Sequence, residues 1–92
     1  MSTYIYSMWK NSPAGSPKEF YSELDPSRYE TRKVEIFAGG KMSYASKQKE
    51  VPPTRLGITP VPTIAEIMTQ SEFTVKEISK QEFESIWTKA TK

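Results

Sequence analysis

The hairpin-like stretch at residues 32–46, RKVEIFAGGKMSYAS, constrains the fold more than any other part of the chain. Apolar and polar side chains alternate on both sides of a glycine pair, and a period of two is typical of strands with one buried face. Gly39 and Gly40 supply the positive φ angles that a tight turn needs. The stretch therefore predicts a β-hairpin, with strands at about 29–37 and 41–46.

The length of the turn decides which side chains share a face, because a one-residue slip moves every side chain to the other face. A three-residue loop with Gly40 left-handed gives one face four apolar side chains, whereas a two-residue Gly-Gly loop gives a thinner apolar face. We therefore expect the three-residue loop. The opposed pairs are then Ile36 with Met42 and Val34 with Tyr44, and the residues on the other face include Lys33, Glu35 and Phe37.

The length and composition indicate one small domain, residues 1–92, of a soluble globular kind. Hydrophobic residues make up 36% and charged residues 26% of the 92 positions, and the formal net charge is only +2. The chain has no cysteine and no histidine, which removes disulfides, thiolate chemistry and the commonest general base and metal ligand. We see no signal peptide and no membrane-spanning run. We therefore expect a cytoplasmic protein with no cofactor.

The rest of the chain predicts two more strands, a strap and two helices. Residues 3–10 form a first strand. Residues 18–24 read either as a strand or, through a capping box at Ser16–Glu19, as a helix, and we favour the strand. Residues 47–62 hold four prolines and no hydrophobic period, which indicates an ordered strap. Capping boxes predict helices at about 63–70 and 80–90, with residues 73–78 as an extended link between them.

Strands followed by helices predict an α+β fold. We expect an antiparallel meander of about four strands, with the short and the longer C-terminal helix packed on one face. The residues of the longer helix expected to pack on the Val34 and Ile36 face are Phe83, Ile86 and Trp87.

Several residue combinations resemble a known family over almost the whole chain. They are Tyr21-Ser22-Glu23-Leu24-Asp25, Tyr29-Glu30-x-Arg32-Lys33-Val34-Glu35-x-Phe37, Thr54-Arg55-Leu56-Gly57, Pro60-x-Pro62 and Glu82-Phe83-x-x-x-Trp87. Together with Trp9 and Tyr44-Ala45, they are similar to the small bacterial family called domain of unknown function 6881. The resemblance implies an α+β domain and no assigned activity, and it favours the strand reading before Tyr21.

Charged residues that could take part in acid–base catalysis gather in one part of the sequence. They are Glu23, Glu30, Glu35, Arg28 and Arg32. Two carboxylates can act as acid and base, but neighbouring arginines keep both ionised. Glu30 and Arg32 lie two apart on one strand, which suits a surface ion pair, so solvated or structural pairing is the default. We find no metal site and expect no catalytic activity.

The remaining function is binding, and we expect the partner to be another protein or a second copy in a homodimer. An immunity-type protein or a subunit of a larger complex fits this description. If the helices cover the Val34 face, the aromatic side chains of the first strand lie on the opposite face. There they are exposed to solvent unless the strap buries them. The candidate partner-binding residues are Tyr4, Tyr6, Met8, Tyr21 and Phe37. Nucleic-acid binding through strand aromatics and the basic strap is the less favoured alternative.

Overall fold

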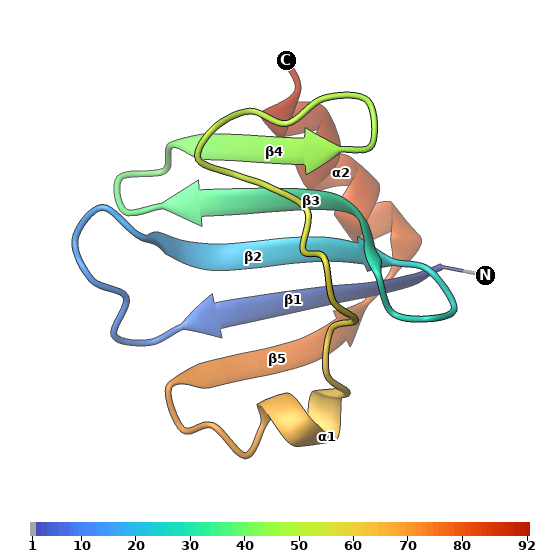
Figure 1. The fold of residues 1–92 in the computed structure, drawn as a ribbon. Helices are drawn as coiled ribbons and strands as arrows, with labels where there is room; N and C mark the ends of the chain where they lie inside the picture. Colours follow the sequence, from blue (N-terminus) through green and yellow to red (C-terminus); the bar gives the residue numbers. More distant parts are fainter. Residues whose placement is uncertain (1) are drawn as a thin grey trace.

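The computed structural model describes residues 2–92 and shows an α+β fold built on a five-stranded antiparallel sheet. The strand order is β4-β3-β2-β1-β5, so the first four strands form the expected meander and β5 joins it beside β1 (Figure 1). The elements are β1 Thr3–Trp9, β2 Pro17–Leu24, β3 Glu30–Phe37, β4 Met42–Ser46, α1 Ile64–Ile67, β5 Phe73–Ile78 and α2 Lys80–Ala90. The expectation of about four strands is one too few, because residues 73–78 pair with β1 instead of linking two helices.

The hairpin of β3 and β4 has the predicted register. Ile36 lies opposite Met42 and Val34 opposite Tyr44. The Gly40 N–H donates to the Phe37 carbonyl at 3.0 Å across a three-residue loop. Both loop glycines have φ near +91°, so Gly39 as well as Gly40 occupies the left-handed region. Both glycines thus supply the positive φ angles expected of them, and the pattern is typical of a type II turn followed by a left-handed residue.

Residues 17–24 are a strand, and the alternative helix does not form. β2 lies between β1 and β3, and its side chains alternate between the two faces of the sheet. The following turn is fixed by Asp25, whose Oδ1 accepts hydrogen bonds from the backbone N–H groups of Ser27 at 2.9 Å and Tyr29 at 3.0 Å. Such a local side-chain bond is the usual reason for aspartate at the start of a turn.

One face of the sheet is covered by α2, and we call it the α2 face. Ser79 caps the helix through the predicted capping box with Glu82, and Phe83 is fully buried. The core on this face consists of Tyr4, Ile78 and Phe83, with Tyr6, Tyr21 and Trp87 packed against it. Trp87 also meets the ring of Tyr44 edge-on at 5.3 Å, so α2 reaches the hairpin as predicted.

The placement of β1 differs from our expectation. Tyr6 pairs with Tyr21 of β2, and Tyr21 pairs with Val34 of β3, so all three side chains lie on the α2 face. The expectation that Tyr4, Tyr6 and Met8 lie opposite the Val34 side is therefore wrong. The physical reason is register: the loops that set the pairing of β1 with β2 and β2 with β3 bring their aromatic residues to the same side as the hairpin's apolar row.

The other face of the sheet is crossed by the strap, residues 47–62, and we call it the strap face. The strap runs across this face and leads into α1, while α2 lies behind the sheet (Figure 1). The core here consists of Ile5, Leu24 and Val75, against which Val61, Ile64 and Ile67 pack. The two helices thus lie on opposite faces, and the expectation that both pack on one face is wrong. Among residues 2–92 no helix is long and apolar enough to cross a membrane.

Candidate functional site

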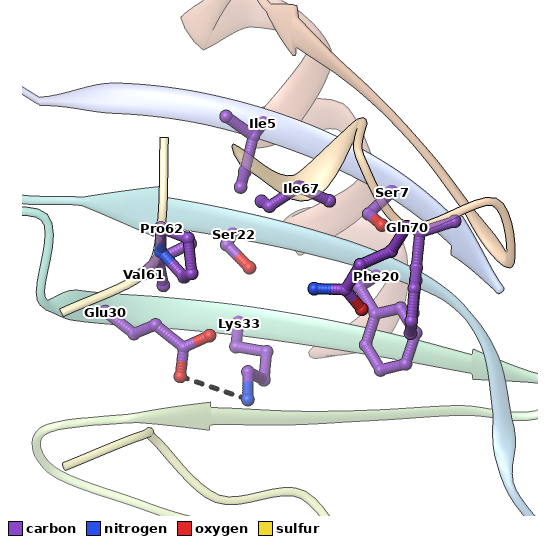
Figure 2. Close-up of a pocket in the computed structure, with 11 residues that line it drawn as sticks. Ile5, Ser7, Phe20, Ser22, Glu30, Lys33, Val61, Pro62, Ile67 and Gln70 are labelled. Atoms are coloured by element: carbon purple, nitrogen blue, oxygen red, sulfur yellow. Dashed lines mark ion pairs between the residues drawn. The ribbon is translucent and has the colours of Figure 1, made fainter. Parts of the chain in front are cut away.

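A groove opens on the strap face between the sheet, the strap and α1, and we call it the strap-face groove. Its volume is about 340 Å³. The residues that line it are Ile5, Ser7, Phe20, Ser22, Glu30, Lys33, Val61, Pro62, Ile67, Gln70 and Phe73. In Figure 2 the strands form the floor, while Pro62 and Ile67 stand over it. The groove is therefore a hollow of mainly apolar character above the middle of the sheet.

Small side chains on the two central strands explain why the hollow exists. Ser22 of β2 pairs with Ile5 of β1, and Ser7 pairs with Phe20, so each serine sits beside a larger apolar neighbour on the same face. Both serine side chains point into the groove (Figure 2). A strand residue buried under a covering layer is usually large and apolar. Serine at both positions leaves space that the strap and α1 do not fill.

An ion pair closes one end of the groove. The Lys33 ammonium lies 3.0 Å from Glu30 Oε1, and both side chains are largely shielded from solvent. Glu30 Oε1 also accepts the Gly57 N–H at 2.5 Å, and Lys33 donates to the Arg55 carbonyl at 3.0 Å. These charges therefore have partners within the chain, so the groove offers a ligand apolar walls and neutral polar groups rather than a net charge.

The wall that the strap contributes is tied to the sheet by polar contacts. Thr54 is fully buried, and its hydroxyl lies 2.6 Å from Glu35 Oε1 and also bonds the Ser43 hydroxyl. At the other end of the strap, Arg28 donates from Nε to the Val61 carbonyl at 2.8 Å and from Nη2 to the Pro62 carbonyl at 2.8 Å. The strap is thus held to the rest of the chain at its middle and at its C-terminal end, which fixes its course beside the groove.

Aromatic rings extend the apolar surface beyond the groove. Phe73 lines the groove and stacks on Trp9 with ring centroids 5.7 Å apart and an interplanar angle of 19°. Trp9, Phe20 and Phe73 are each partly exposed, and Phe37 on β3 has the same intermediate exposure. Partly exposed aromatic side chains beside a hollow are typical anchor points for a binding partner.

The polar cluster predicted from the sequence is divided between the two faces. Arg32 lies on the α2 face, where Nη2 is 2.7 Å from Glu23 and 2.6 Å from Glu84. Its guanidinium also sits over the Phe83 and Trp87 rings at 4.9 and 5.1 Å. The expected pair of Glu30 with Arg32 does not form, because the two side chains are on opposite faces and Glu30 pairs with Lys33 instead.

The electrostatics of this cluster favour a structural role. The hydrogen bonds from Arg32 lower the pKa of Glu23 to about 2, against the opposing effect of burial. The same contacts lower the pKa of Glu84 and raise that of Arg32. A carboxyl that stays ionised at neutral pH has no proton to give, so Glu23 is poorly suited to acid catalysis. The evident effect of the cluster is to tie α2 to the sheet, because Arg32 of β3 bonds both Glu23 of β2 and Glu84 of α2. Within the described residues no group of three or more acidic side chains could hold a metal ion.

The structure disperses the five candidate binding residues. Tyr4 is buried against Phe83, with ring centroids 5.4 Å apart, and so cannot contact a partner in this conformation. Tyr6 donates from its hydroxyl to Glu19 at 2.7 Å and packs on Tyr21, and both rings are only partly exposed. Burial, followed by the contact with Glu19, raises the pKa of Tyr6. Met8 lies with Tyr4 and Tyr6 on the α2 face, whereas Phe37 lies on the strap face.

The groove could not be predicted from the sequence pattern. The available signal was a pair of serines at central positions of two predicted strands, where the pattern otherwise calls for large apolar side chains. That signal gains meaning only when both strands are known to be central and their faces are known.

Comparison with known proteins identifies one family. The model for the family described as Domain of unknown function (DUF6881) matches residues 3–92. No curated protein and no solved structure is similar enough to this chain to count as a match.

Proposed function

The chain belongs to the DUF6881 family, a domain of unknown function, and we propose that it is a non-catalytic protein-interaction domain that takes an apolar segment of its partner into the strap-face groove. The observation that carries this proposal is the unfilled volume of about 340 Å³ above Ser7 and Ser22. Ligand sites usually have volumes of roughly 300–1,000 Å³ and combine apolar walls with a few polar groups.

The polar groups of the groove suit a peptide. Ser7, Ser22 and Gln70 each offer both hydrogen-bond donors and acceptors, which match the N–H and C=O groups of an extended backbone. The apolar walls suit one large side chain of that segment, and the satisfied Glu30–Lys33 pair gives no preference for a charged one. A partner segment that is apolar and uncharged therefore fits best.

This chemistry suits two biological settings. One is an immunity-type protein that masks a toxin, and the other is a subunit that docks on a larger complex. A bacterial cytoplasmic protein remains part of the proposal, because a chain without cysteine suits a reducing compartment.

Selection from a displayed library of random peptides tests the proposal directly. We expect the enriched peptides to carry a large apolar residue and to bind at least about tenfold more weakly to Ser22→Phe, which fills the groove. The matched control is Ser85→Phe on the exposed side of α2, where the same substitution should leave binding unchanged. Thermal melts of both variants check that each one folds, and Ser22→Leu is a smaller alternative.

Peptides that bind Ser22→Phe and the parent chain equally well would place the contact outside the groove. An enriched set without apolar residues would contradict the proposed chemistry.

Nucleic-acid binding is the second candidate, because the partly exposed rings of Phe20 and Phe73 lie on the strap face, and the strap that crosses this face carries Lys47 and Lys49. Bases can stack on such rings while lysines meet phosphates. This function predicts an affinity for single-stranded oligonucleotides that falls steeply with salt and weakens when lysines of the strap, such as Lys47 and Lys49, are replaced.

A further inference from the structure

An apolar side chain on the strap is left almost entirely in solvent. Ile58 is 92% exposed, which is the highest value among the exposed large hydrophobic residues, ahead of Met68 at 64% and Tyr29 at 42%. It lies within residues 56–65, a run of ten positions without a charged side chain. An isoleucine exposed to this degree contributes almost nothing to the core of its own chain, so its burial against another molecule would be favoured by the hydrophobic effect.

The same side of the molecule carries an unfilled apolar hollow. Ile58 belongs to the strap, which crosses the strap face (Figure 1). Val61 and Pro62 of the same strap line the strap-face groove. The uncharged run around Ile58 matches the neutral, mainly apolar lining of the groove. Ile58, which we call the knob, and the strap-face groove, which we call the hole, are thus both mainly apolar and without net charge, and both lie on the same side of one chain.

Ile58 cannot fill the groove of its own chain. The backbone before it is held by the Gly57 N–H on Glu30 at 2.5 Å, and the backbone after it is held by the Val61 N–H on the Arg28 carbonyl at 2.8 Å. Val61 and Pro62 already form the wall of the groove on that side. These bonds hold the loop so that Ile58 faces solvent, and only another molecule can receive it.

We infer that the partner segment of the strap-face groove is the Ile58 loop of a second copy of this chain. The inference rests on the proposed function, whose partner it names. A two-fold axis between knob and groove makes the contact reciprocal: each Ile58 enters the groove of the other copy, and the pair closes on itself. The dimer buries in each subunit the most exposed large apolar side chain and the mainly apolar strap-face groove.

The test is the oligomeric state of the whole chain, measured by analytical ultracentrifugation over a range of concentrations. The wild-type chain is expected to dimerise. Ile58→Asp removes the knob, Ser22→Phe blocks the hole, and each should raise the dissociation constant at least about tenfold. Met68→Asp, which likewise replaces an exposed large apolar side chain by an acidic one just after α1, should leave it unchanged.

Mixing the two disabled variants gives a second readout. Ile58→Asp retains a groove and Ser22→Phe retains a knob, so the mixture can make one knob-in-groove contact that neither variant makes alone. Dimers should therefore form in the mixture at concentrations at which each variant alone is monomeric.

A wild-type chain that stays monomeric up to its solubility limit would overturn the inference, and so would a dimer that both variants leave intact. The proposed function is judged separately on the same molecules. If selected peptides bind the groove of a monomeric chain and Ser22→Phe blocks them, the groove serves a different protein and only the self-association is wrong. If neither dimers nor groove-dependent peptides are found, both proposals are wrong.

Discussion

Replacement of Thr54 by valine removes the buried anchor of the strap without changing the size of the side chain. Thr54 is 0% exposed, and its hydroxyl lies 2.6 Å from the Glu35 carboxylate and also bonds the Ser43 hydroxyl. Because valine has nearly the same shape, the substitution opens no cavity. The free energy of unfolding should therefore change only through the lost hydrogen bonds and the polar groups left without partners.

The magnitude follows from the two bonds. A hydrogen bond to a charged group contributes about 1.5–3 kcal/mol and a neutral one about 0.5–1.5 kcal/mol. Because Glu35 and Ser43 are both buried, neither recovers a full shell of water, and a loss of about 3 kcal/mol is expected. In a domain of this size that corresponds to a fall in melting temperature of roughly 12–24 °C.

Urea denaturation followed by tryptophan fluorescence measures this change. Thr59→Val is the matched control, since Thr59 is exposed on the same strap and its replacement should cost almost nothing. Thr54→Ser keeps the hydroxyl and should lose roughly 1 kcal/mol or less. If Thr54→Val unfolds at the same urea concentration as the parent chain, the strap does not depend on this bond and the reasoning is refuted.

Three further outcomes can be measured in the same way. Gly39→Ala and Gly40→Ala should each lower the free energy of unfolding by about 1 kcal/mol, because both positions have φ near +91° although no atom would touch the added Cβ; an unchanged urea midpoint for either would contradict the observed turn. Phe83→Ala should cost about 3–5 kcal/mol, since the ring is fully buried between the sheet and α2, and native-like melting would mean that α2 is dispensable. The depressed pKa of Glu23, about 2 against 4.5, adds stability that is fully present above pH 4.5 and lost as pH falls toward 2. The free energy of unfolding from urea titrations should therefore decline across that window by at most about 3 kcal/mol, and Arg32→Leu should flatten the decline.

The local features of this fold were predictable because their causes are local. The register of the β3–β4 hairpin follows from alternation and the glycine pair, and both helix starts follow from capping boxes at Thr63 and Ser79. Each of these signals lies within a few residues of the structure it determines.

The arrangement of distant segments was not predictable in this way. β5 has only two buried side chains, Val75 and Ile78, and its partner β1 lies about seventy positions earlier in the chain. The assignment of faces failed for a related reason. Register shifts in the β2–β3 pairing, near Pro17 and Glu23, help to decide which side chains share a face, and they leave no clear mark in the sequence. The groove depends on the pairing of distant strands and on the assignment of faces, so it could not be predicted from the sequence.

The insertion of β1 between β2 and β5 has a consequence for how the protein is made. Strands β1 to β4 can pair as soon as they are synthesised, but the second edge of β1 finds its partner only when the chain has been made through Ile78. Until then a nascent chain presents an unpaired strand rich in tyrosine and tryptophan, which is the kind of edge that aggregates. We expect the β1–β5 pairing, rather than the early β3–β4 hairpin, to be the step that protects a newly synthesised molecule from aggregation with other chains.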